Sequence, residues 1–118
     1  MGRSRMGGAG VNIGQIAKMA QQMQAQVAQA QEELKETTIE ATAGGGAVRV
    51  VITGAQEVRH VEIDRGAVDP DEVEMLQDLV MTAVNDAISR SKELERERMT
   101  SIAGGIGLPG VPGLPGIG

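Results

Sequence analysis

The sequence predicts an α+β fold with the element order helix, three-stranded antiparallel meander, long helix (α-β-β-β-α). Two changes of hydrophobic period carry this prediction. Apolar residues recur at steps of three and four in the first third of the chain and again after residue 72, whereas they alternate between residues 39 and 63. A length of 118 residues fits one domain. We therefore expect a flexible basic N-terminal segment (1–11), an α-β-β-β-α domain (12–100) and a flexible Gly/Pro-rich tail (101–118).

The first helix is predicted by a stripe of apolar residues on one face, at the spacing of a coiled-coil seam. The stripe consists of Ile13, Ile16, Ala20, Met23, Val27, Ala30 and Leu34. The glutamine-rich stretch between these residues is made of good helix formers, so we interpret it as helix rather than as prion-like low complexity.

Three strands are predicted by period-two alternation of apolar residues. The alternating sets are Ile39/Ala41, Val48/Val50/Ile52 and Val61/Ile63. Val58 is out of phase with the third set, which predicts a β-bulge near Arg59 or His60. The sequence has one histidine and no cysteine, so His60 is interpreted as a solvated strand residue rather than as a metal ligand.

The glycines Gly44 to Gly46 raise the question of a phosphate-binding loop. Such a loop follows a strand, opens a helix and is commonly followed by Lys-Ser or Lys-Thr. Here the glycines precede a strand-like run, and the nearest basic residue, Arg49, lies inside that run. We therefore interpret Gly44 to Gly46 as the first hairpin turn and the segment 54–56 as the second.

The start of the second helix is predicted by three residues that suit a helix N-terminus. Asp69 is a suitable N-cap, Pro70 occupies the first helical position, and Glu72 completes a capping box. One face is predicted to be buried and contains Val73, Leu76, Val80, Ala83, Val84, Ala87, Ser91 and Leu94. The like charges Lys92 and Arg96 fall on the opposite face, where neighbouring glutamates or an external anion would offset their repulsion.

Composition favours an oligomer. The chain contains no Phe, Trp or Tyr, so its core is built from small aliphatic side chains and Met, and buries little area per residue.

The absence of cysteine fits a reducing compartment. No apolar run has the length of a signal peptide core or a membrane span, so we expect a soluble, cytoplasmic protein without membrane contact.

The predicted helices are longer than the predicted strands, so both helices must overhang the sheet. An overhanging apolar stripe is not tolerated on a monomer. Either the two helices pair as a hairpin that projects from the sheet, or a second subunit covers them.

Positive charge is unevenly distributed. The net charge is −5, but residues 1–31 contain three basic residues and no acid. Residues 32–78 carry the negative balance, and the charges cancel after Asp86, where Arg90, Lys92, Arg96 and Arg98 meet four acids. On these counts alone, a solvated acidic surface is a better interpretation than a nucleic-acid footprint.

The segments "GGGAVRVVITGAQEVRHVEID" and "MLQDLVMTAVNDAISRSKELERERM", together with the Gly/Leu/Pro tail, closely resemble the YbaB/EbfC family of bacterial nucleoid-associated proteins. The resemblance runs from about residue 13 to the tail. It implies a tweezer-like homodimer whose paired helices form two arms that grip double-stranded DNA. It also implies localisation in the nucleoid within the cytoplasm and a role in chromosome organisation, DNA conformation and gene regulation.

Residues for both surfaces follow from the charge map, the predicted faces and this resemblance. The expected DNA-binding residues are Arg3, Arg5, Lys18, Arg90, Lys92, Arg96 and Arg98. The expected dimer interface contains Val48, Val50, Ile52, Val61, Ile63, Leu76, Leu79, Val80 and Val84. No base-reading motif is present, so we expect binding largely without sequence specificity.

A second hypothesis is a dimeric adaptor that binds a replication or recombination protein through its helical arms and apolar tail. An enzyme is disfavoured because polar residues suited to acid, base or nucleophile roles do not converge on a recognisable motif. We expect no metal, no other cofactor and no small-molecule substrate.

Overall fold

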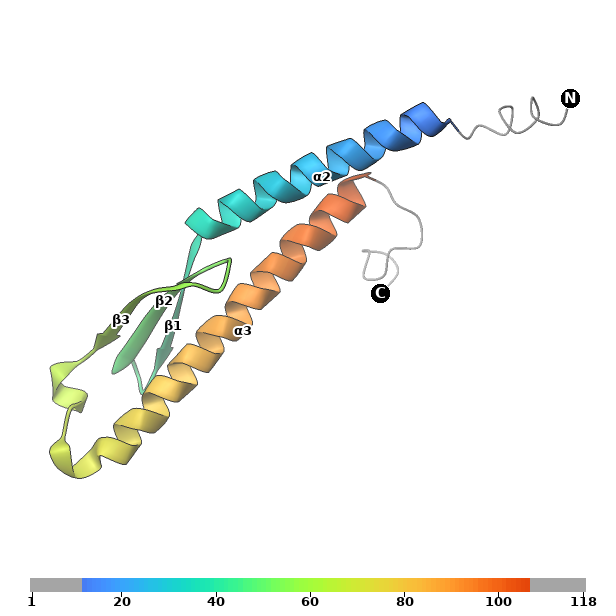
Figure 1. The fold of residues 1–118 in the computed structure, drawn as a ribbon. Helices are drawn as coiled ribbons and strands as arrows, with labels where there is room; N and C mark the ends of the chain where they lie inside the picture. The colour runs from blue at the N-terminus through green and yellow to red at the C-terminus, as the bar shows by residue number, and fades with distance from the viewer. Residues whose placement is uncertain (1–11, 107–118) are drawn as a thin grey trace, which may run out of the picture.

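The computed structural model describes residues 12–106, which form two long helices joined by a three-stranded sheet (Figure 1). The elements are α2 (Ile13–Glu36), β1 (Thr38–Ala43), β2 (Val48–Thr53), β3 (Val58–Ile63), the short 3₁₀ helices η1 (Arg65–Ala67) and η2 (Pro70–Glu72), and α3 (Val73–Ile106). The strands are antiparallel in the order β1-β2-β3. The predicted fold class and element order are therefore confirmed.

Helix α2 has Asn12 as its N-cap, whose side chain bonds to a backbone N–H group that has no partner within the helix. The side chain of Asn12 accepts a hydrogen bond from the backbone N–H of Gln15 at 3.2 Å. Of the apolar stripe on α2, only Ala30 and Leu34 are buried. The residues at the opposite end of the stripe are exposed, so most of α2 is not covered by the sheet.

The core lies between one face of the sheet and α3. Its buried members are Ala41, Ala43, Val48, Val50, Ile52, Ala83 and Ala87. Alanines on α3 let the helix approach the sheet closely, and the β-branched residues of β2 fill the space. Strand β3 lies at the edge, and every one of its six residues is exposed.

The hairpin turn between β1 and β2 explains the run of three glycines. Gly44, Gly45 and Gly46 all have positive φ angles, of 66°, 68° and 97°. L-residues rarely adopt this backbone region, so glycine removes a steric cost at each position. The backbone N–H of Ala47 donates to the carbonyl oxygen of Gly44 at 3.3 Å and closes the turn. The interpretation as a hairpin turn is confirmed.

The predicted β-bulge is also present. Val51 pairs with His60 and Ile52 pairs with Val58, so Arg59 is the extra residue on β3. The bulge returns Val58 to the apolar face, which explains why it is out of phase with Val61 and Ile63 in the sequence.

Helix α3 starts where the sequence predicts and ends later than expected. The Asp69 carboxylate accepts from the backbone N–H of Asp71 at 2.9 Å, and η2 forms the first turn before α3 proper. A capping box would also join Asp69 and Glu72 through their side chains. Here the backbone N–H of Glu72 instead donates to the backbone carbonyl oxygen of Asp69 at 2.9 Å. The helix continues to Ile106, so the domain boundary expected at residue 100 falls inside it.

A polar junction holds α2, the β2–β3 turn and α3 together. Ser91 is fully buried on α3, where its hydroxyl donates to the carbonyl oxygen of Thr53 at 2.6 Å. The same hydroxyl oxygen accepts from the backbone N–H of Gln56 at 3.1 Å. On the other side of the turn, Gly54 N donates to Leu34 O at 2.9 Å. A Cβ atom at Gly54 would lie 2.6 Å from Leu34 Cδ2, so only glycine allows this approach.

Beyond this junction, α2 and α3 run side by side away from the sheet (Figure 1). At 1.5 Å per residue the helices measure roughly 36 and 51 Å, whereas the strands span only about 20 Å. The overhang is therefore confirmed, and α2 is paired with the C-terminal half of α3. We call this projecting pair, α2 with residues 90–106 of α3, the arm.

Candidate DNA-binding surface

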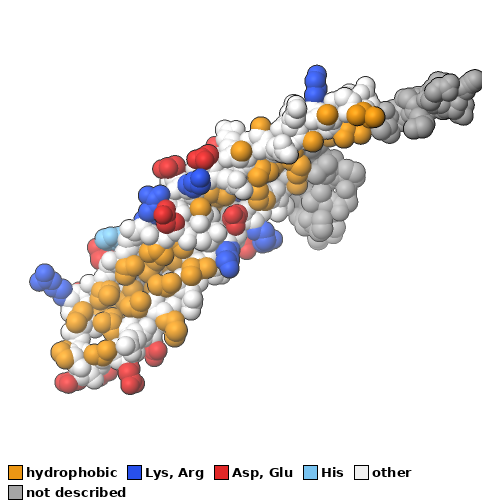
Figure 2. Space-filling model, viewed as in Figure 1, with side chains coloured by type: hydrophobic (Ala, Val, Ile, Leu, Met, Phe, Trp, Pro, Cys, Tyr) orange, Lys and Arg blue, Asp and Glu red, His pale blue; other side chains and the backbone are white. Residues whose placement is uncertain are grey.

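The cations of the arm do not form a single patch. Lys18 is exposed on α2, whereas Arg90, Lys92, Arg96 and Arg98 lie on α3. Lys18 stands 15 residues before Glu33, the α2 partner of Arg98, which is about 22 Å along the helix axis. Figure 2 shows basic and acidic side chains intermixed along the middle of the molecule. The arm therefore presents scattered positive charges to a partner.

Lys92 and Arg96 are the cations best placed to meet an external anion. They are four residues apart, so they share one face of α3, and both are exposed. Arg96 forms an ion pair with Glu93, one turn away on the same helix. Lys92 makes no ion pair within residues 12–106. An exposed ion pair contributes only about 0–1 kcal/mol, so a phosphate can replace Glu93 at little cost.

Arg90 and Arg98 lie in more acidic surroundings. Arg90 Nε donates to Asp86 Oδ2 at 3.0 Å, and Arg90 lines a groove together with Glu93 and Glu97. Arg98 Nη1 donates to Glu33 Oε1 at 2.8 Å and so joins α3 to α2. The groove around Arg98 contains Glu32, Glu33 and Glu36. Arg90 and Arg98 are each surrounded by several carboxylates, whereas Arg96 forms an ion pair with one and Lys92 with none within residues 12–106. Arg90 and Arg98 are therefore poorer phosphate ligands than Lys92 and Arg96.

The outer face of the sheet is a charge-balanced surface. Arg49 on β2 lies between Glu40 on β1 and Glu62 on β3, and forms an ion pair with each of them. The hydrogen bond to Glu40, followed by the one to Glu62, raises the pKa of the Arg49 guanidinium above its usual value. Arg59 Nε donates to Glu57 Oε1 at 3.0 Å. This face offers little net positive charge for a phosphate backbone.

The pairs within α3 follow from helical spacing, as the sequence analysis expects for the glutamates beside Lys92 and Arg96, but the pair between Arg98 and Glu33 does not. Glu33 and Arg98 are 65 residues apart, and only the pairing of α2 with α3 brings them together. The remaining expected DNA-binding residues, Arg3 and Arg5, lie outside the described residues.

An apolar face remains uncovered on the sheet side of the molecule (Figure 2). It consists of Val58, Val61 and Ile63 on β3 and of Val73, Val80 and Val84 on α3. The β3 residues point to the same side of the sheet as the core but lie beyond the reach of α3, so each is exposed by 38% or more. We call this set the uncovered apolar face.

The expected interface residues divide into two groups. Val48, Val50 and Ile52 have no exposed surface within the single chain, because α3 already covers them. They therefore have no surface to offer a second subunit. Val61 and Ile63 are exposed, and Leu76, Leu79, Val80 and Val84 are half buried against the core.

Residues 7–106 match the model of the YbaB/EbfC DNA-binding family. The chain belongs to this family. The match includes both helices and the whole sheet, so the arm and the uncovered apolar face are parts of the family domain. The family description, which names DNA binding, agrees with the expectation that the protein is not an enzyme.

Individual relatives of this YbaB/EbfC chain point in the same direction. A nucleoid-associated protein of Acetivibrio thermocellus is 47% identical over 94% of this chain and 99% of its own length. A nucleoid-associated protein of Moorella thermoacetica is 52% identical over 85% of this chain and 99% of its own length. The crystal structure of the uncharacterized protein HP0035 from Helicobacter pylori has a TM-score of 0.69 at 24% identity, covering 78% of this chain and 97% of that one. This last similarity concerns the fold.

Residues 12–106 of the YbaB/EbfC chain lack two kinds of feature, a membrane-spanning helix and a cluster of metal-binding side chains. Neither of its long helices has a stretch apolar enough to span a bilayer. In the same part of the chain, His, Asp and Glu side chains do not gather in groups of three or more that could hold a metal ion.

Proposed function

We propose that this protein binds double-stranded DNA as a homodimer, largely without sequence specificity. Family membership over residues 7–106 is the observation that carries the proposal. In this proposal the protein acts at the nucleoid, in the cytoplasm, and contributes to chromosome organisation, DNA conformation and gene regulation. The names of the relatives from Acetivibrio thermocellus and Moorella thermoacetica support the assignment to the nucleoid.

The uncovered apolar face supports a homodimer. It borders the edge strand β3, and exposed apolar patches rimmed by polar residues mark protein interfaces. A two-fold axis through this face would cover it with the same face of a second copy. The interface then contains Val61, Ile63, Val80 and Val84 of the expected residues, together with Val58 and Val73. Val48, Val50 and Ile52 support it from the core of each protomer.

The arms supply the DNA contact. A dimer through the sheet region leaves both arms free, because the arm projects away from the uncovered apolar face (Figure 1). Lys92 and Arg96 face outward on the arm, and Lys18 lies farther along it. Contacts of this kind neutralise phosphates and carry no sequence information, which accounts for binding without base specificity.

Replacing Lys92 and Arg96 together by alanine is expected to weaken DNA binding about equally on duplexes of unrelated sequence. Each lost phosphate contact lowers the slope of log K against log salt by roughly one. Folding should survive because both side chains are exposed. Deleting residues 1–8, which removes Arg3 and Arg5, should act in the same way. Gel-shift titrations across a salt series measure the slope, and unchanged affinity and slope in both variants would exclude the arm contact.

Arg98→Ala provides a matched variant with the opposite expected result. Because Arg98 ties α3 to Glu33 on α2, its loss should lower the free energy of unfolding by about 0.5 kcal/mol, or the melting temperature by roughly 2–4 °C. The salt slope of DNA binding should stay at the parental value. Thermal melting and the same gel-shift series distinguish the two roles. A parental melting temperature with a reduced salt slope would assign Arg98 to the DNA contact instead.

The adaptor hypothesis has no comparable support. The family description names DNA, and neither relative reported above is named for a replication or recombination partner.

A further inference from the structure

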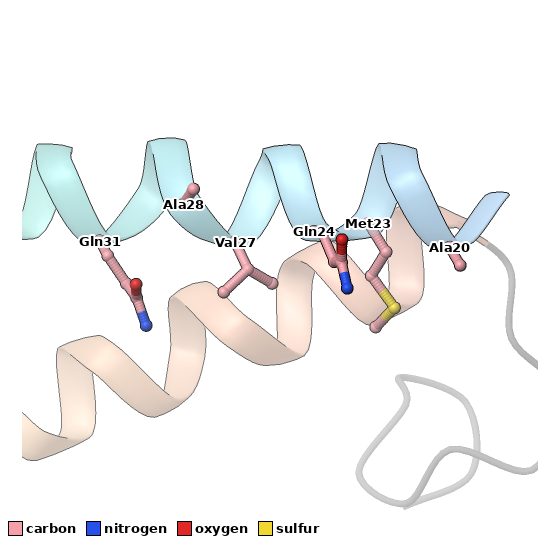
Figure 3. Close-up of a pocket in the computed structure, with 6 residues that line it drawn as sticks. All are labelled: Ala20, Met23, Gln24, Val27, Ala28 and Gln31. Carbon is pink, nitrogen blue, oxygen red and sulfur yellow. The ribbon is translucent and has the colours of Figure 1, made fainter. Parts of the chain in front are cut away.

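An apolar groove runs along α2 within the arm (Figure 3). It is lined by Ala20, Met23, Gln24, Val27, Ala28 and Gln31 and has a volume of about 460 Å³. The side chains of Met23 and Val27 extend from α2 toward α3 in Figure 3, and both are half buried. Within residues 12–106 no charged side chain lines the groove, so the phosphate contacts proposed above do not use it.

The sequence after α3 has a periodicity that fits such a groove. Residues 107–118, "GLPGVPGLPGIG", lie outside the described residues, but their order places an apolar side chain at every third position. These side chains belong to Leu108, Val111, Leu114 and Ile117. A polyproline II helix has three residues per turn, and prolines preset its φ angle. In that conformation all four apolar side chains lie along one edge, and the segment carries no charged side chain.

The tail begins close to the groove, and its length matches the length of the groove. Helix α3 ends at Ile106, beside the N-terminal half of α2 (Figure 1). The groove extends from Ala20 to Gln31, which is about 17 Å of helix. Leu108 to Leu114 spans roughly 19 Å at the 3.1 Å rise of polyproline II. A polyproline II segment from Leu108 to Leu114 is therefore long enough to place three apolar side chains along the whole groove.

We propose that the tail, residues 107–118, turns back at the end of α3 and docks in this groove as a polyproline II segment. Its apolar edge lies against Met23 and Val27. The thioether of Met23 adapts to irregular partners, and in the absence of aromatic residues it takes the place of an aromatic lining. Covalent linkage favours the chain's own tail over a free ligand, because a short linker gives a millimolar effective concentration.

The absence of cysteine allows a direct test on the full chain. A nitroxide spin label is attached to a Gly118→Cys variant, and paramagnetic broadening of backbone amides is measured by NMR. Docking predicts at least twofold loss of amide intensity within residues 20–31 and parental intensity in β1, β2 and β3. Equal broadening of all exposed amides, or none, would overturn the proposal. In a second experiment, isotope-labelled chains without a nitroxide are mixed with unenriched chains that carry one. Full broadening of residues 20–31 in the isotope-labelled chains would show docking between chains and would overturn docking within one chain.

Two tail variants test whether docking depends on the apolar edge of the tail or only on its overall composition. Changing Leu108, Val111 and Leu114 to serine should abolish the broadening of residues 20–31. Changing Gly107, Gly110 and Gly113 to serine places the same number of serines on another edge and should preserve it. The substituted residues lie outside residues 12–106, so we expect both variants to keep the core of the sheet and α3. Equal behaviour of the two variants would contradict recognition through the apolar edge.

Discussion

Val50→Lys is expected to unfold the protein. Val50 is completely buried between the sheet and α3, where nothing within residues 12–106 is positioned to neutralise an ammonium group. A buried unpaired charge costs several kcal/mol, and a small domain has only about 5–15 kcal/mol in total. The core here is made of small side chains and has little stability to spare. Circular dichroism at 25 °C should therefore show loss of most helical signal.

The neighbouring residue is the matched control. Val51 points to the outer face of the sheet, where Glu40 is its cross-strand partner on β1 and His60 its partner on β3. Val51→Lys places an ammonium group opposite the Glu40 carboxylate, and opposite charges on facing strands interact favourably by roughly 0.2–1 kcal/mol. This variant should melt within a few degrees of the parent. Parental melting of Val50→Lys would show that this sheet face is not the core.

Ile63→Lys is expected to dissociate the proposed homodimer. Ile63 is 38% exposed in the single chain, so a lysine there is tolerated by the protomer. In a symmetric interface the substitution appears on both subunits, and two desolvated ammonium groups oppose association. Sedimentation at micromolar concentration should change from dimer for the parent to folded monomer for the variant.

His60→Lys tests whether the effect belongs to the uncovered apolar face. His60 lies on the same strand but on the outer face, beside Glu62. Its replacement by lysine should leave the sedimentation coefficient of the dimer unchanged. A compact monomer of the parent protein at micromolar concentration, or a dimer that survives Ile63→Lys, would contradict the proposed interface.

The predictable parts of the fold are those encoded in local patterns. Period-two alternation predicts the three strands, and the phase of Val58 locates the bulge at Arg59. Asp69 and Pro70 mark the start of the second helix because they satisfy local backbone requirements. The C-terminal end of α3 was not predictable in this way. Gly104 and Gly105 lower helix propensity by about 1 kcal/mol each relative to alanine, yet the helix continues through them.

The predictable parts of the site are residue types, not their environments. Alternation identifies Val48, Val50 and Ile52 as one apolar face, but it does not say whether α3 of the same chain or a second chain covers that face. Likewise, the sequence shows that Arg98 is basic but not that Glu33, on the other helix of the arm, holds it. Long-range packing decides both questions.

In the proposed function the arms hold DNA through its phosphates. The most direct test is the affinity of the parent protein for two duplexes of unrelated sequence between about 50 and 200 mM salt. We expect similar affinities for both duplexes, and a common linear decrease of log K with log salt of about 0.9 per phosphate contacted. Because few cations of the arm are free of carboxylates, the decrease should be shallow. Affinity that is independent of salt, or binding to only one of the two duplexes, would contradict it.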